Sequence, residues 1–197
     1  TDSLPSQACY TANAHALARY AALCQENDIV PIVEPEVLID GNHDLGRSFE
    51  VTQHAQHTVF AALADQDVDL RGIVLKPSMV ISGAGAADRA GIREVAQETL
   101  RCLLSTVPAA VPGIAFLSGG QSDEEATQHL NAMNEIGGSL PWAVTFSYGR
   151  ALQAAAMKRW AGHSDNVESA RQVAFHRAQM NGAAALGQYS SEMEKAA

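Results

Sequence analysis

The chain has 197 residues, of which 47% are hydrophobic and 18% are charged, a balance that excludes intrinsic disorder and favours one compact domain. Asp and Glu number 22 against 13 Lys and Arg, so the net charge of −9 argues against non-specific binding to nucleic acid or anionic lipid. No apolar run approaches the roughly 20 residues of a membrane span, and the polar start does not resemble an export signal. We therefore expect a soluble, cytoplasmic protein.

Hydrophobic periodicity predicts the first elements along the chain. Apolar residues recur at helical spacing over residues 6–25, which predicts a helix. Residues 29–33 form a short apolar run rich in β-branched side chains, which indicates a strand covered on both faces. A second apolar stripe over residues 48–64 predicts the helix that follows this strand.

The same strand-then-helix cycle repeats three more times. Ser122 and Glu125 form a capping-box pattern at the start of one helix, and Gly137 and Gly138 mark its end. The last helix is predicted to be capped by Ser164 or Asp165. The remaining strands are expected at 72–75, 113–117 and 143–146, and the remaining helices at about 92–105, 123–136, 150–160 and 166–185.

Strands that alternate with helices predict an α/β fold with a parallel sheet. Two architectures are compatible with this order: an open doubly wound sheet and an arc of a (β/α)8 barrel. The first lacks its usual mark, since no G-x-G-x-x-G motif follows the first strand. The barrel is favoured because every strand ends in polar or glycine-rich residues, where barrels collect their catalytic groups.

Lys76 is one of only three lysines, and it lies at the end of an apolar strand directly before Pro77. Partial burial there lowers the pKa of an ammonium group, and a neutral amine can attack a carbonyl. Glu34, one strand earlier, can serve as the acid of such a reaction, and Glu36 lies two residues further along the same side of a regular strand. A lysine that simply pairs with a carboxylate, beside a solvated loop, explains these residues equally well.

The ends of the third and fourth strands suggest an anion site. Ser118 and Gly119 follow one strand, and Ser147, Gly149 and Arg150 follow the next. Glycines let backbone N–H groups approach an anion, a helix N-terminus adds partial positive charge, and an arginine can bind two phosphate oxygens. A tight turn alone accounts for Ser-Gly-Gly, but its pairing with the arginine favours a phosphorylated ligand.

No metal or cofactor site is predicted. His54 and His57 are three residues apart on a helix but lack an acidic or third histidine partner at ligand spacing. Cys9, Cys24 and Cys102 are an odd number without a C-x-x-C pair, which indicates free and mostly buried thiols in a reducing compartment.

Four motifs in collinear order resemble class I fructose-bisphosphate aldolase. They are Ile32-Val33-Glu34-Pro35-Glu36, Leu75-Lys76-Pro77-Ser78-Met79-Val80, Phe116-Leu117-Ser118-Gly119-Gly120-Gln121-Ser122 and Thr145-Phe146-Ser147-Tyr148-Gly149-Arg150-Ala151-Leu152. The resemblance implies a metal-independent lyase of glycolysis that cleaves fructose 1,6-bisphosphate through a Schiff base. It further implies a homotetramer and a single partial domain, 1–197, that forms the C-terminal half of a TIM barrel.

By the same resemblance, Lys76 is the Schiff-base lysine, Glu34 the acid and base at the carbinolamine, and Glu36 a carboxylate that positions lysine and substrate. Ser118, Gly119, Ser147, Gly149 and Arg150 match phosphate-binding residues of the family. The strands resemble the fifth to eighth of that barrel, so groups of the first four strands have no counterpart. A non-catalytic half barrel that retains phosphate binding or oligomer contacts is therefore the alternative, whereas deoxyribose-phosphate aldolase and transaldolase fit the motifs poorly.

Overall fold

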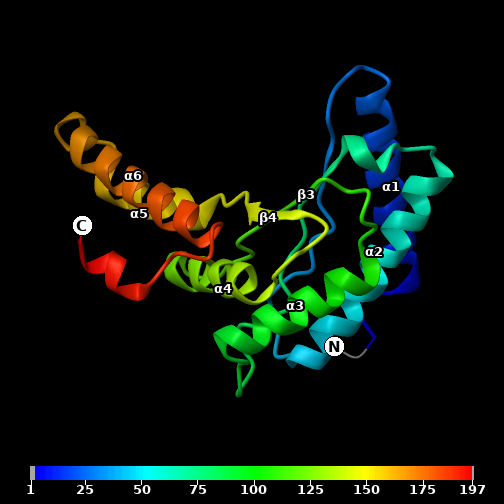
Figure 1. The fold of residues 1–197 in the computed structure, drawn as a ribbon, viewed down its shortest axis with the longest axis horizontal. Helices are drawn as coiled ribbons and strands as arrows, with labels where there is room; N and C mark the ends of the chain where they lie inside the picture. Colours follow the sequence, from blue (N-terminus) through cyan, green and yellow to red (C-terminus); the bar gives the residue numbers. More distant parts are fainter. Residues whose placement is uncertain (1–2, 197) are drawn as a thin grey trace.

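The computed structural model describes residues 3–196 and contains the predicted alternation of strands and helices (Figure 1). The strands are shorter than predicted at the first two positions, while the helices agree to within three residues. The strands are β1 (Ile32–Val33), β2 (Val74–Leu75), β3 (Gly113–Phe116) and β4 (Ala143–Phe146). The α-helices are α1 (Gln7–Gln25), α2 (Leu45–Asp65), α3 (Ile92–Thr106), α4 (Asp123–Ile136), α5 (Arg150–Trp160) and α6 (Val167–Ala184); the 3-10 helices are η1 (Leu70–Gly72), η2 (Ser164–Asn166) and η3 (Ser191–Ala196).

The four strands form one parallel sheet in the order β1-β2-β3-β4. Strand order follows chain order without the reversal that defines a doubly wound sheet. Each strand is therefore one step around an arc, as in a barrel. This order confirms the α/β prediction and selects the barrel arc over the open sheet.

The helices among residues 3–196 cover one face of this sheet. Successive side chains of a strand point to opposite faces, so one register row shares a face. The row that faces the helices is buried throughout and consists of Val33, Leu75, Ile114 and Val144. On the opposite face Ile32 remains 40% exposed. The prediction of a strand covered on both faces over 29–33 is therefore wrong for the described residues, and Ile29 and Val30 precede β1 rather than belong to it.

The helices divide between the two ends of an elongated molecule (Figure 1). Helices α1 and α2 pack together at one end, and α5 and α6 pack together at the other. Between them, α3 and α4 contact each other, and α4 also packs against β4. The main hydrophobic core runs through this middle layer and includes Leu103, Phe116, Leu130 and Met133. The carboxyl ends of the strands are thus held on a continuous packed base.

Helix starts show which predicted caps form. The Ser122 hydroxyl accepts a hydrogen bond from the Glu125 N–H at 3.1 Å, as predicted, but the Glu125 carboxylate binds Arg89 instead of returning to the cap. At the last helix neither predicted cap is used, because η2 inserts an extra turn and Asn166 is the N-cap of α6. Local sequence favours a cap at each of these positions, and tertiary packing decides which one is occupied.

The cysteines are free but are not mostly buried as predicted. Cys9 is exposed, Cys24 is half-buried and Cys102 is buried. Burial raises the pKa of the Cys102 thiol to about 12, so this thiol stays protonated and packs as an apolar group. Across residues 3–196, no helix combines the length and the apolar character that crossing a bilayer demands.

Candidate functional site

Lys76 follows β2 directly and forms an ion pair with Glu34, which follows β1. The Lys76 Nζ atom lies 2.8 Å from the Glu34 Oε2 atom, and the lysine side chain is 20% exposed against 46% for the glutamate. The backbone positions the two side chains for this contact, because the Lys76 N–H donates to the Val33 carbonyl at 2.7 Å and extends the parallel ladder by one residue. Lys76 follows Leu75 and Glu34 follows Val33, and these two preceding residues belong to the buried row. Since successive side chains alternate between faces, both side chains belong to the uncovered face of the sheet.

Glu36 lies outside the regular strand. The strand ends at Val33, and the Glu36 N–H bonds back to the Glu34 carbonyl at 2.9 Å, so the expected pleat does not continue through both carboxylates. Glu34 and Glu36 nevertheless line one cavity of about 540 Å³ between α1, α2 and the segment after β1. Arg47 lines the same cavity and supplies positive charge to it.

A tight turn of residues 118–121 follows β3. The Gln121 N–H donates to the Ser118 carbonyl at 3.0 Å, and φ is +55° at Gly119 and +87° at Gly120. Positive φ at both central residues defines a type I′ turn, which explains the Gly-Gly pair. Within residues 3–196, the N–H groups of Ser118, Gly119 and Gly120 donate to no other backbone group. The turn therefore offers three adjacent donors.

Arg150 approaches this turn from the neighbouring strand end. Gly149 is the N-cap of α5 and Arg150 its first residue. Within residues 3–196 the Arg150 and Ala151 N–H groups donate to no backbone carbonyl, while the Leu152 N–H donates to the Gly149 carbonyl at 3.1 Å. A methyl group built on Gly120 would lie 3.9 Å from the Arg150 Nη2 atom and 3.2 Å from a methyl of Ile39. Ser147 donates its N–H to the Phe116 carbonyl at 2.8 Å, which aligns the two strand ends. The guanidinium and the glycine turn thus share one small region.

The sheet order brings the predicted residues that follow β2, β3 and β4 to one edge, while Glu36 lies in the cavity beside α1 and α2. Lys76 lies at the end of β2, Ser118 after β3, and Ser147 after β4, while the Leu117 N–H bonds to the Pro77 carbonyl at 3.2 Å to link the two middle ends. The Lys76 amine, which is paired with a carboxylate, and the glycine turn of residues 118–121 therefore lie at the ends of adjacent strands. This arrangement suits covalent attack on the carbonyl of a phosphorylated substrate.

A buried polar pair behind the turn was not predicted from the sequence. The Gln121 side chain donates from Nε2 to the Ser118 carbonyl at 3.0 Å, and its Oε1 lies 2.6 Å from the His129 Nδ1 atom. Desolvation, aided by the charge of Arg89, lowers the pKa of His129 to about 4. The signal was present, because His129 interrupts the apolar face of Ala126, Leu130 and Met133 on α4.

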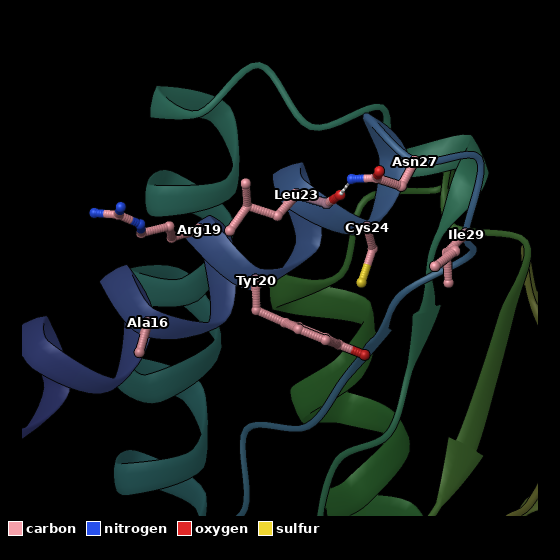
Figure 2. A pocket seen from close by; sticks show the side chains of 7 residues that line it. All are labelled: Ala16, Arg19, Tyr20, Leu23, Cys24, Asn27 and Ile29. Atoms are coloured by element: carbon pink, nitrogen blue, oxygen red, sulfur yellow. Dashed lines mark hydrogen bonds between the residues drawn. The ribbon is translucent and has the colours of Figure 1, made fainter.

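A second hollow lies at the end of α1 (Figure 2). Its volume is about 570 Å³, and Tyr20, Leu23, Cys24 and Ile29 supply most of its apolar lining. The Tyr20 ring extends across the hollow toward the Cys24 side (Figure 2). Burial, followed by a hydrogen bond with the Cys24 thiol, raises the pKa of Tyr20. This hollow holds no carboxylate, and it adjoins the exposed residues before β1.

Comparison with known proteins places this geometry in a family context. The family model described as fructose-bisphosphate aldolase class-I matches residues 1–197. A probable fructose-bisphosphate aldolase class 1 from Xanthomonas campestris is 54% identical over 189 residues, which are 95% of this chain and 56% of that protein. The cytosolic fructose-bisphosphate aldolase 4 from Arabidopsis thaliana is 47% identical over 190 residues, covering 96% of this chain and 48% of that protein.

A solved structure agrees with these relatives. The Plasmodium falciparum fructose-bisphosphate aldolase, crystallised with TRAP and a small-molecule inhibitor, superposes with a TM-score of 0.93 at 46% identity. The superposition covers 95% of this chain and 54% of that chain. The chain thus spans about half the length of the proteins it matches, at 48–56% for these relatives.

Proposed function

The chain belongs to the class-I fructose-bisphosphate aldolase family, and on this premise we propose that the whole protein cleaves fructose 1,6-bisphosphate through a Schiff base on Lys76. The products of the proposed reaction are dihydroxyacetone phosphate and glyceraldehyde 3-phosphate. The observation that carries the proposal is the 2.8 Å contact between the Lys76 amine and the Glu34 carboxylate at adjacent strand ends. Among residues 3–196 neither side chain forms another hydrogen bond, and both are partly exposed, at 20% and 46%.

The proposed chemistry begins with a proton transfer within this pair. Movement of one proton from Lys76 to Glu34 leaves a neutral amine, which attacks the C2 carbonyl of the ketose to form a carbinolamine. Glu34 then returns the proton to the carbinolamine hydroxyl, which leaves as water and creates the protonated Schiff base. When the C3–C4 bond breaks, its electron pair forms the C=C bond of an enamine and neutralises the cationic nitrogen, while the C4 hydroxyl gives its proton to a base proposed to lie in the other half of the barrel and becomes the aldehyde. A proton then adds to C3, and water hydrolyses the Schiff base to release dihydroxyacetone phosphate and the Lys76 amine. Glu36 is proposed to position the lysine and the substrate.

The glycine turn and Arg150 are proposed to hold one substrate phosphate. The three free N–H donors of residues 118–120 point to a compact anion, and the guanidinium supplies the balancing charge. Gly149 contributes the N-terminal end of α5, and Ser147 is proposed to add a hydroxyl. A phosphate fixed there orients the ketose so that its carbonyl meets Lys76 on the adjacent strand.

Borohydride trapping tests the proposal. The whole protein is incubated with dihydroxyacetone phosphate, reduced with borohydride and digested for peptide mass analysis. We expect the reduced adduct on Lys76, with Lys158 and Lys195 unmodified as internal controls, since both of these are exposed. Recovery of unmodified Lys76 sinks the assignment, whereas chelating agents are expected to leave trapping unchanged.

A non-catalytic half barrel is the second candidate, favoured by the uncovered sheet face and by the length matched in relatives. Assay of residues 1–197 alone separates the two candidates: we expect no useful cleavage rate from them, and ordinary turnover overturns that expectation. We further propose a cytoplasmic location, which the name of a cytosolic relative supports. On the family resemblance alone we propose a homotetramer of the whole protein, in which each subunit contains both halves of the barrel.

A further inference from the structure

We propose that Gln121 and His129 are positioning residues that hold the glycine turn in its phosphate-binding shape. This inference rests on the proposed phosphate role of Ser118, Gly119 and Arg150 and adds the device that keeps the turn ready. Gln121 is 8% exposed and His129 is 1% exposed, so both side chains are inside the protein and neither can touch substrate directly.

The hydrogen bonds of the pair have one consistent direction. Gln121 uses its amide nitrogen as donor to the Ser118 carbonyl at 3.0 Å, so its amide oxygen is free to accept. The His129 Nδ1 atom, 2.6 Å away, must then carry the proton and donate it. His129 is therefore neutral, with its hydrogen on Nδ1, and the donor chain runs from His129 through Gln121 to Ser118.

The chain ends at the carbonyl that closes the turn. The Ser118 carbonyl accepts from both the backbone N–H and the side-chain amide of Gln121. With this carbonyl held inward, the N–H groups of Gly119 and Gly120 are free for an anion. The same amide contacts the Met79 sulfur at 3.6 Å, which links the turn to the segment that follows Lys76.

The pair also has a feature that packing alone does not explain. The His129 Nε2 atom is buried and has no hydrogen-bond partner among residues 3–196. An unpaired buried acceptor is destabilising, and an apolar side chain in this position avoids that cost. A donor that locks Gln121 in one amide orientation supplies the compensating benefit, because a flipped amide places its oxygen against the Ser118 carbonyl.

The test measures the binding of inorganic phosphate by titration calorimetry with the whole protein. His129→Leu removes the donor, and we expect phosphate binding to weaken about 5- to 10-fold, as the loss of one neutral hydrogen bond predicts. His129→Asn retains an N–H near the position of Nδ1 and is expected to restore binding to within about 2-fold of the original. Gln121→Met is the second variant and is expected to weaken binding in the same direction.

Asn131→Leu is the matched control. Asn131 lies on the same helix and is also buried, but its side chain accepts a hydrogen bond from the Tyr189 N–H and not from the turn. We expect this variant to lower the melting temperature without changing phosphate binding. Equal weakening by Asn131→Leu and His129→Leu, or no weakening by either His129→Leu or Gln121→Met, overturns the inference.

Failure of the underlying function gives a different result. Arg150→Ala is expected to abolish phosphate binding, and persistence of binding in that variant removes the phosphate role from the glycine turn itself. Borohydride trapping at saturating dihydroxyacetone phosphate provides the second readout. The pair acts on binding, so His129→Leu is expected to raise the concentration needed for half-maximal trapping and to leave the saturated rate unchanged.

Discussion

At the scale of single residues, Lys76 and His129 are two ionisable groups that the fold places in opposite settings. Lys76 obtains a proton partner because the β1–β2 ladder places Glu34 2.8 Å from its amine. The His129 ring is neutral at pH 7, because burial, the larger cause, lowers its pKa. In the proposed function, the first group reacts as an amine and the second holds the glycine turn as a neutral ring.

Replacement of the Glu34 carboxyl group by an amide is expected to slow formation of the Schiff base. Glu34→Gln keeps the shape of the side chain but cannot shuttle a proton, and general acid–base catalysis contributes roughly 10²- to 10⁴-fold. Single-turnover borohydride trapping measures the rate. Glu168→Gln is the matched control, because its pair with Arg171 on α6 is exposed, at 73% and 75%. Equal rates for Glu34→Gln and the unaltered protein contradict the acid role.

The lowered pKa of His129 predicts how stability changes in acid. The folded-state pKa of about 4 lies below the ordinary histidine value of 6.5, so between these pH values the unfolded chain binds a proton that the folded protein does not. The free energy of unfolding is unaffected above pH 6.5 and falls as the pH is lowered, by a total of about 3 kcal/mol at pH 4. The measurement is urea denaturation at pH 7 and pH 5. The fall in the free energy of unfolding between these two pH values is expected to be smaller in His129→Asn than in the unaltered protein. An identical acid dependence in both proteins refutes it.

At the scale of elements, the turns between strand and helix restrict the residue type more strongly than the strands do. β1 and β2 have two residues each, yet the segments after them and after β3 hold the functional groups. The type I′ turn of residues 118–121 requires positive φ twice, which only glycine adopts without strain. Short strands suffice because the helices behind them provide the packing.

The turn geometry makes Gly120 sensitive to a methyl group. Gly120→Ala places a Cβ atom at φ +87° and 3.2 Å from Ile39, so both backbone strain and crowding are expected to destabilise the protein. Gly138→Ala is the control, since φ is +54° there and nothing lies within 4 Å of the added atom. We expect each variant to lose about 1–2 kcal/mol from the left-handed backbone. Phosphate calorimetry is expected to register a loss only for Gly120→Ala.

At the scale of the whole molecule, the last helical turn is attached to the barrel arc by a buried charge cluster. Arg177 on α6 is 5% exposed; it bonds Glu194 of η3 and reaches the Thr127 hydroxyl of α4 at 2.8 Å. His176 and Tyr189 also bond the Glu194 carboxylate, at 2.9 Å and 3.0 Å. Although burial opposes it, hydrogen bonds from Arg177 and His176 lower the pKa of Glu194.

Breaking this cluster is expected to release the C-terminal segment. Glu194→Gln leaves the Arg177 charge buried without its partner, which costs about 3–5 kcal/mol for a buried pair. Glu192→Gln is the matched control, because its pair with Lys195 is about three-quarters exposed at 75% and 73% and contributes little. Limited proteolysis near residue 190 is expected to accelerate only in Glu194→Gln. Equal cleavage of both variants contradicts the role of the cluster.

Acid has the same effect on the unaltered cluster. The folded-state pKa of Glu194 lies below its ordinary value, so its stabilising contribution is complete above that ordinary value and is lost as the pH falls through the folded pKa. Proteolysis of the C-terminal segment is therefore expected to rise on acidification in the unaltered protein. Glu194→Gln, which cannot titrate there, is expected to show less of this pH dependence.

The sequence alone determined the α/β class, the order of elements, Lys76 at a strand end and the glycine turn beside Arg150. These features depend on local rules, namely the period of hydrophobic residues and the backbone freedom of glycine, which act over a few neighbouring positions. The strand lengths and the N-cap of α6 were predicted less well, because packing moves element boundaries without changing their type.

Only the tertiary structure decided which distant side chains meet. The Lys76–Glu34 contact joins residues 42 apart, Tyr189 bonds Asn131 across 58 positions, and Gln121 turns its amide toward His129 inside the helix layer. It also decided that one face of the sheet is uncovered among residues 3–196. A pattern of residue types limits such pairings but does not select one, because each hydrogen bond depends on the register of strands and the rotation of helices that the whole core sets.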